Sequence, residues 1–250
     1  MPEDDRELSF LEHLVELRSR LLKACLSVLA VLIVLLPFSR DLYETLASPL
    51  MSKMPEGSSM IAIDVASPFL TPFKLTLLTA IIISIPMVLY QLWAFVAPAL
   101  FKHEKRLARP LLLSSVLLFY TGCAFAYFVV FPLVFGFLTG IAPEGVAVMT
   151  DISRYLNFAM TLFLAFGITF EVPIATIILV ATGITTADKL ASWRPYIIVG
   201  AFALGMVLTP PDVISQTLLA LPMWLLFEIG IVFSRILIRG EKPETDQATS

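Results

Sequence analysis

The sequence predicts an all-α, polytopic membrane protein with six transmembrane helices. Hydrophobic residues make up 58 % of the 250 residues and charged residues only 15 %, whereas average soluble proteins carry about 25 % charged residues. So few charges cannot cover a surface that faces water. In addition, four apolar runs meet or approach the length of about 20 residues that a bilayer-spanning helix needs. Both observations place most of the chain inside a bilayer.

The spans follow one another in the order 21–38, 73–95, 110–135, 155–181, 196–209 and 213–233. The segment Ser9-Phe10-Leu11-Glu12 matches a capping box and predicts a short amphipathic interfacial helix that runs into the first span. The apolar run of the fifth span, 196–208, has only 13 residues, which reach roughly 20 Å of the ~30 Å hydrocarbon core. We therefore expect the short last two spans to thin the bilayer locally or to sit partly within protein.

A proline pair separates the last two spans. Thr209-Pro210-Pro211-Asp212 ends the fifth helix, since proline resists helix continuation, and Asp212 can cap the N-terminus of the sixth helix. We interpret Asp212 as a structural residue.

The distribution of Lys and Arg sets the orientation. With the N-terminus inside, thirteen of the 17 basic residues fall on the inner side and four on the outer side, which predicts that both termini are cytoplasmic. The predicted outer loops, 40–72 and 136–154, retain apolar patches, so we expect them to pack together as an ordered periplasmic cap. Residues 1–239 are expected to form one membrane domain and the polar tail 240–250 to be disordered.

The composition also argues against several classes of function. The formal net charge is −3, so no basic excess points to nucleic acid. Cys25 and Cys123 both lie in apolar runs and form no disulfide framework or metal motif. The chain has no Gly-x-Ser-x-Gly or His-Glu-x-x-His motif. We therefore expect no metal, no cofactor, no catalytic residue and no enzymatic activity.

Three polar side chains within the spans are candidates for a functional or a packing role. Glu171 lies in Phe170-Glu171-Val172-Pro173 of the fourth span, where a charge costs about 2.5–3.5 kcal/mol on insertion scales and the proline kinks the helix. A proton relay, a substrate groove, a partner contact and a neutral, hydrogen-bonded glutamate all remain open. Gln216 in the sixth span can bridge helices or contact another subunit, and Glu228 can snorkel or pair with a basic residue.

The cytoplasmic side offers a pair of carboxylates. Glu104 lies among basic neighbours in the inner loop, and Glu16 lies on the N-terminal helix. If they converge, they form an acidic site that binds guanidinium groups bidentately. Otherwise Glu104 is a surface residue that balances local positive charge, and sequence spacing does not decide between the two.

The chain resembles the TatC family of the Sec-independent, twin-arginine protein translocase over nearly its whole length, up to about Arg239. Any single matching element is weak, but their order and spacing are specific. The stretches that carry the resemblance are Phe10-Leu11-Glu12-His13-Leu14-Val15-Glu16-Leu17-Arg18, Ala66-Ser67-Pro68-Phe69, Tyr90-Gln91-Leu92-Trp93-Ala94-Phe95-Val96-Ala97-Pro98-Ala99-Leu100, Glu104, Phe170-Glu171-Val172-Pro173, Arg194-Pro195-Tyr196 and Leu208-Thr209-Pro210-Pro211-Asp212.

The resemblance implies a receptor for twin-arginine signal peptides in the bacterial cytoplasmic (inner) membrane. Such a receptor recruits TatA-type and TatB-type single-span subunits, works in several copies, and passes folded cargo across the membrane by means of the proton-motive force. Glu104 would accept the signal-peptide arginines, with Glu16 in support and Phe95 beside the site. Glu171 would line a concave helix face where signal peptide or partner spans lie, and Pro49 would belong to the assembly cap. Membrane lipid would be a further partner.

A second hypothesis is a proton-coupled small-solute transporter with Glu171 as the proton carrier. The sequence contains no internal repeat, although transporters are often built from one. This argues against the second hypothesis.

Overall fold

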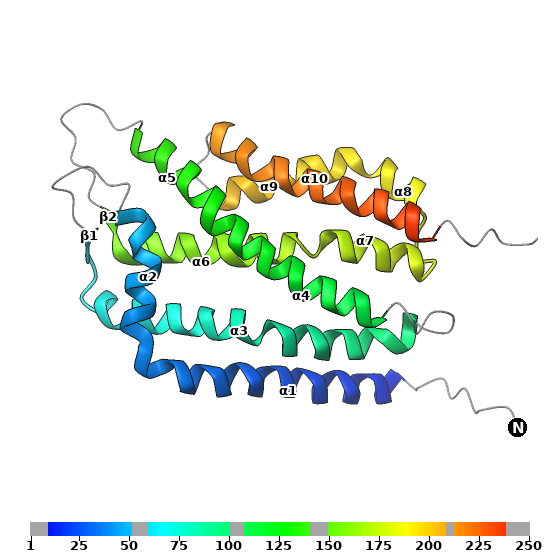
Figure 1. The fold of residues 1–250 in the computed structure, drawn as a ribbon, viewed down its shortest axis with the longest axis horizontal. Coiled ribbons are helices and arrows are strands. Elements are labelled where there is room, and N and C mark those ends of the chain that lie inside the picture. The colour runs from blue at the N-terminus through cyan, green and yellow to red at the C-terminus, as the bar shows by residue number, and fades with distance from the viewer. Residues whose placement is uncertain (1–9, 52–59, 101–107, 141–149, 209–212, 239–250) are drawn as a thin grey trace, which may run out of the picture. The chain divides into compact units, whose positions relative to one another are not determined.

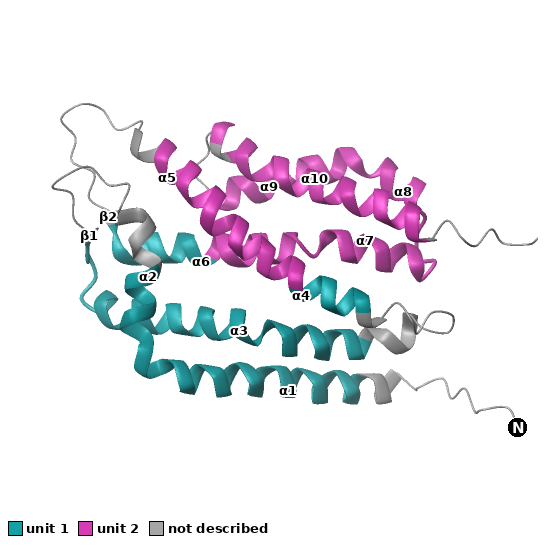
Figure 2. Cartoon of the chain, viewed as in Figure 1, with its two compact units in different colours: residues 1–116, 147–160 teal, residues 117–146, 161–250 magenta. Residues whose placement is uncertain are grey.

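The computed structural model describes residues 10–51, 60–100, 108–140, 150–208 and 213–238. They form helices and one short β pairing (Figure 1). Their contacts divide the chain into two compact units, residues 1–116 with 147–160 and residues 117–146 with 161–250 (Figure 2). The division falls within two helices, α4 (Ala108–Phe125) and α6 (Ile152–Thr169). A single membrane domain and a concave helix face stay predictions.

The first unit begins with α1 (Phe10–Leu35), a 3₁₀ turn η1 (Leu36–Phe38) and α2 (Ser39–Met51). As predicted, the N-terminal amphipathic segment continues into the first apolar segment without a break. Pro37 occupies the first turn of η1, where its missing N–H and its ring end the α-helical pattern of α1.

The expectation of a loop from residue 40 onward is wrong, because residues 39–51 form α2 and pack on α3. Leucine recurs there at positions 42, 46 and 50, a four-residue spacing that is typical of an amphipathic helix. This periodicity was the signal for a helix inside the presumed loop.

The longest helix of this unit is α3 (Ser67–Leu100), which begins six residues before the predicted span. Its N-terminal extension includes Pro68. Proline is tolerated in the first turn because backbone N–H groups there have no intrahelical acceptor. α3 runs antiparallel beside α1 (Figure 1). The Ser84 hydroxyl donates to the Ser27 carbonyl oxygen at 3.4 Å, which fixes the register of the two helices.

The two predicted outer loops meet in a parallel pair of strands. β1 (Met60–Ile61) pairs with β2 (Thr150–Asp151), with Met60 opposite Thr150. Below the strands, the Ser153 hydroxyl of α6 donates to Ser67 Oγ at 2.8 Å and lies 2.9 Å from Thr71 Oγ1 of α3. The expected contact between the two loops is therefore confirmed.

The second unit contains the end of α4, the π-helical segment η2 (Ala126–Val130), α5 (Phe131–Gly140), the second half of α6, and then α7 (Val172–Ala181), α8 (Ala187–Ser192), α9 (Arg194–Leu208) and α10 (Val213–Ile238). α10 packs against α7, α8 and α9. Buried Leu190, Phe227 and Ile231 form the core between them.

Aromatic rings fill the contact between α4, η2 and α6. Phe125 lies 5.5 Å from Phe166 between ring centroids, and Tyr127 stacks on Phe163 at 6.3 Å. Gly122 allows the close approach, because an added Cβ would lie 2.5 Å from the Phe166 carbonyl oxygen. Such a distance cannot accommodate a side chain without a backbone shift.

Among the described residues, five helical segments are long and apolar enough to cross a membrane: Leu14–Thr45, Ser67–Phe95, Pro110–Phe137, Ile152–Ala181 and Gln216–Leu237. The shorter apolar helix Arg194–Leu208 corresponds to the predicted fifth span. The expectation of a short sixth span is wrong, since α10 has 26 residues and reaches roughly 39 Å. Six crossings and cytoplasmic termini stay predictions.

Candidate functional site

Glu16 lies in the N-terminal half of α1, where it is half-buried. Its Oε1 atom accepts hydrogen bonds from Arg20 Nε at 2.8 Å and from Arg20 Nη2 at 2.5 Å. The two residues are four positions apart and therefore lie on one face of the helix. Such a pair contributes only about 0.3–0.5 kcal/mol, so Arg20 holds the Glu16 carboxylate weakly.

Helix geometry indicates that Phe95 and Glu16 lie at about the same level of the α1–α3 pair. The Ser27–Ser84 contact fixes the antiparallel register. Glu16 lies eleven residues before Ser27 (27 − 16 = 11), and Phe95 lies eleven residues after Ser84 (95 − 84 = 11). Both helices rise 1.5 Å per residue. Glu16 and Phe95 are therefore equally far along the helices from the Ser27–Ser84 contact, on the same side of it.

Glu104 lies outside the described residues, four positions beyond the end of α3 at Leu100. Its convergence with Glu16 stays a prediction. The N-terminal end of α1, which carries Glu16, and the C-terminal end of α3, which precedes Glu104, lie side by side (Figure 1).

Glu171 marks the break between α6 and α7 in the second unit. Its N–H donates to the Ile168 carbonyl oxygen at 3.0 Å, a three-residue step, while α7 restarts at Val172 with Pro173 in its first turn. The kink expected near Pro173 is therefore confirmed. The Glu171 side chain is half-buried, and its Oε1 atom is inaccessible to solvent.

Gln216 lies where α9 and α10 approach closely. A Cβ added to Gly205 of α9 would lie 3.5 Å from both Cα and the carbonyl oxygen of Gln216, so the two backbones are in ordinary contact there. Small residues at such crossings are typical of helix packing in membranes. The expected role of Gln216 in a partner groove stays a prediction.

Pro49 and Asp212 are the two remaining residues of the predicted site. Pro49 belongs to α2 rather than to the expected loop. Asp212 lies outside the described residues, so its interpretation as an N-cap stays a prediction.

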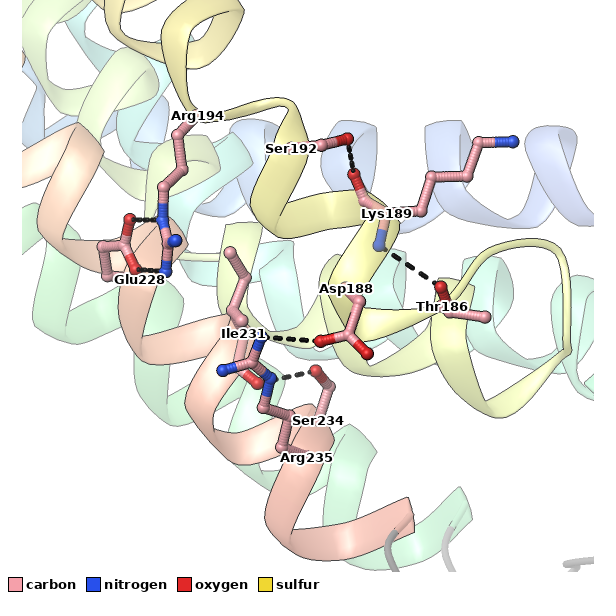
Figure 3. Close-up of polar contacts among 9 residues, drawn as sticks. All are labelled: Thr186, Asp188, Lys189, Ser192, Arg194, Glu228, Ile231, Ser234 and Arg235. Atoms are coloured by element: carbon pink, nitrogen blue, oxygen red, sulfur yellow. Dashed lines mark hydrogen bonds and ion pairs between the residues drawn. The ribbon is translucent and has the colours of Figure 1, made fainter. Parts of the chain in front are cut away.

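Two ion pairs hold α8 and α9 against α10, as Figure 3 shows. Glu228 of α10 accepts two hydrogen bonds from Arg194, from Nε at 2.6 Å and from Nη2 at 2.8 Å. Arg235 Nη2 donates to Asp188 Oδ1 at 2.8 Å. The expected pairing of Glu228 with a basic residue is confirmed. The Asp188–Arg235 pair was missed because its partners are 47 positions apart and no sequence pattern joins them.

Asp151 is a second polar residue that sequence reasoning missed. Its Oδ1 atom accepts from the Arg154 N–H at 2.8 Å, in the manner of a helix N-cap, and its Oδ2 atom accepts from the Ile63 N–H at 3.1 Å. These backbone hydrogen bonds, that of Arg154 first, hold the pKa of the Asp151 carboxyl below its usual value. An Asp three positions before a helical residue is typical of a helix N-cap, so the spacing of Asp151 and Arg154 was the signal in the sequence.

The described residues contain no group of three or more His, Cys, Asp or Glu side chains that would hold a metal ion. Among the described carboxylates, Asp151 accepts hydrogen bonds from backbone N–H groups, Glu228 from Arg194 and Glu16 from Arg20. The contacts of Asp151 and Glu228 join segments that are far apart in the sequence.

Known proteins are similar to this chain over most of its length. The family model described as Sec-independent protein translocase protein (TatC) matches residues 12–222. The chain is 55 % identical to the Sec-independent protein translocase protein TatC of Azotobacter chroococcum mcd 1, over 100 % of this chain and 98 % of that protein. It is 59 % identical to the protein of the same name from Escherichia coli (strain K12), over 90 % of this chain and 88 % of the relative.

A solved structure has the same fold. The crystal structure of the twin arginine translocase receptor TatC superposes with a TM-score of 0.82 at 40 % identity, covering 91 % of this chain and 100 % of the other. The matched proteins are named as protein translocase components, not as solute transporters. This chain belongs to the TatC family of Sec-independent protein translocase proteins, and it is a multi-pass bacterial membrane protein.

Proposed function

We propose that this chain binds the paired arginines of twin-arginine signal peptides at the end of the α1–α3 pair. The antiparallel register of these helices is the observation that carries the proposal, because it sets Glu16 level with Phe95. Glu104 follows on the chain only four residues after the end of α3. Glu104 is therefore close in sequence to the helix end at which the arginines would bind.

Arginine suits such a site better than lysine. Its planar guanidinium offers a fork of donors that matches a carboxylate bidentately, whereas the lysine ammonium is a compact, strongly hydrated charge. An exposed pair contributes only about 0–1 kcal/mol. Discrimination between arginine and lysine therefore requires carboxylates that converge and are partly shielded from water. Glu16 is already half-buried.

The protein would act as the receptor core and recruit TatA-type and TatB-type single-span subunits. Gln216 and the closely packed α9–α10 crossing offer a polar position beside an apolar helix pair, which suits a partner span. Glu171 offers a second polar position within the bilayer. This role requires no catalytic group, and both termini would face the cytoplasm.

The test is cross-linking between a signal peptide and membranes that contain the full chain. A photoreactive residue is placed beside the arginine pair, and an Arg-Arg peptide is compared with a Lys-Lys peptide. Glu104→Ala should reduce the Arg-Arg cross-link about tenfold, the loss expected for one charge-assisted bidentate pair. Glu16→Ala should reduce it less, since Arg20 shares that carboxylate.

Glu44→Ala is the matched control, because Glu44 is an exposed carboxylate on α2 and should leave the cross-link unchanged. Equal labelling by the two peptides, unaffected by Glu104→Ala, would show that arginine recognition takes place elsewhere.

A further inference from the structure

The first unit contains a polar pocket at the start of α3 and α6. Its volume is about 340 Å³, and its lining includes the hydroxyls of Ser67, Thr71 and Ser153. These hydroxyls hydrogen-bond to one another and tie the first turns of the two helices together. These hydrogen bonds therefore link two walls of the pocket, whose position is distinct from the α1–α3 end described above.

Two cations line this pocket, Lys74 of α3 and Arg154 of α6. Both side chains are exposed, and neither forms an ion pair with another residue in the described part of the chain. The N-termini of α3 and α6 add partial positive charge at the same place. Together these groups favour a ligand that carries a phosphate or a similar anion.

The two carboxylates of the pocket differ in what they can bind. Asp151 directs both oxygens at backbone N–H groups of Ile63 and Arg154, so its charge is largely used within the fold. Asp64 is exposed and lines the pocket. A ligand that fits all these groups carries a phosphate for the two cations and an ammonium for Asp64.

The position of the pocket indicates a lipid. It lies at the beginning of the apolar segments Ser67–Phe95 and Ile152–Ala181, the level at which headgroups meet the hydrocarbon core. Phe69 is 79 % exposed and Phe73 43 % exposed on the first turns of α3, so their rings offer apolar surface beside the pocket. Leu70, 42 % exposed, lines the pocket itself, so the apolar surface for acyl chains begins at its rim.

We propose that this pocket binds the headgroup of a zwitterionic phospholipid, with the phosphate held by Lys74 and Arg154 and the ammonium by Asp64. The acyl chains run along α3 past Leu70 and Phe73. The bound lipid joins the first turns of α3 and α6, next to the β1–β2 pair.

The experiment measures lipid retention by native mass spectrometry on the full chain purified in detergent and titrated with phosphatidylethanolamine. The double variant Lys74→Gln/Arg154→Gln should bind about tenfold more weakly, since it loses the charge-assisted hydrogen bonds to the phosphate. Diacylglycerol with the same acyl chains should not be retained. Asp64→Asn should remove the preference for phosphatidylethanolamine over phosphatidylglycerol.

Two controls separate this effect from a general loss of charge or of fold. Arg40→Gln removes an exposed cation of α2 that does not line the pocket and should leave retention unchanged. Lys74→Arg/Arg154→Lys keeps both charges and should retain the lipid. The same binding by every variant would overturn the proposal.

Two further results would also overturn it. Displacement of the lipid by millimolar inorganic phosphate would identify a free-phosphate site. A photoreactive residue at Asn157, which lines the pocket, should label lipid in native membranes, and labelling of a protein instead would identify a partner surface.

Discussion

The described carboxylates of this chain differ in the groups that hold them. Asp151 is fixed by backbone N–H groups and Glu228 by a bidentate arginine. Glu16 has a weaker partner, Arg20, on its own helix. Under the proposed function, a ligand arginine at Glu16 would compete only with Arg20, a flexible side chain four residues away on the same helix.

Asp151 gives the first unit a pH dependence that can be measured. Its folded-state pKa is lowered, Arg154 N–H being the largest cause, so the unfolded state binds a proton more readily than the folded state. The stabilisation is present above the unfolded carboxyl pKa of about 4 and is lost as the pH falls through the lower folded value. The Tm difference between wild type and Asp151→Asn, measured in detergent, should be largest near pH 7 and shrink below about pH 4.

A Tm difference that is constant from pH 7 to pH 3 would show that Asp151 acts only as a neutral acceptor. Asp41→Asn is the control, since Asp41 is an exposed carboxylate near the start of α2 and should lower Tm less at neutral pH.

At the scale of the elements, backbone contact between helices depends on particular glycines. Gly230 of α10 faces α7, where an added Cβ would contact Thr176 Oγ1 and lie 2.9 Å from Pro173 Cα. α7 cannot move aside easily, because Pro173 and Thr176 are buried in its packed face. The first turn of α7, which contains Pro173, therefore packs directly against Gly230 of α10.

Gly230→Ala should therefore destabilise the second unit by about 1–3 kcal/mol, the usual cost of overpacking. Gly200→Ala in α9 is the matched control, since nothing lies within 4 Å of its added Cβ, and alanine is the better helix former by about 1 kcal/mol. Thermal unfolding in detergent should show a lower Tm for the first variant and an unchanged or higher Tm for the second. Equal Tm values would mean that α7 and α10 separate at no cost.

The elements also show how far sequence reasoning reaches. The apolar runs predicted every long helix, and Pro173 predicted the break in the fourth, because length and proline act locally. α2 was missed because its composition is balanced, and only the leucine spacing indicated a helix. Asp188–Arg235 and the Asp151 hydrogen bond to Ile63 were beyond prediction, because partners 47 and 88 positions apart meet only after the chain folds.

At the scale of the whole molecule, the helices differ in the thickness of bilayer that they match. α9 has 15 residues and reaches roughly 22 Å, against a hydrocarbon core of ~30 Å. α10 is long enough to span. The mismatch therefore belongs to one helix rather than to the whole last hairpin.

The bilayer should consequently be thinner beside α9, because compression of lipid costs only fractions of a kcal/mol per Å. Reconstitution in phosphatidylcholine with acyl chains of 14, 18 and 22 carbons tests this, and the Tm should fall as the bilayer thickens. Cryo-electron microscopy of nanodiscs should show thinned density at α9. Uniform thickness around the protein, together with a Tm independent of chain length, would contradict the expectation.

The β1–β2 pair imposes an order on biosynthesis. Met60 pairs with Thr150, 90 residues further along the chain (150 − 60 = 90). Translation at about 5–20 residues per second brings the second strand roughly 5–18 s after the first. Residues 60–61 must therefore remain accessible while α3, α4 and α5 are made and inserted. The join between the two loops is one of the last contacts of the first unit to form, so an early block in membrane insertion would leave it open.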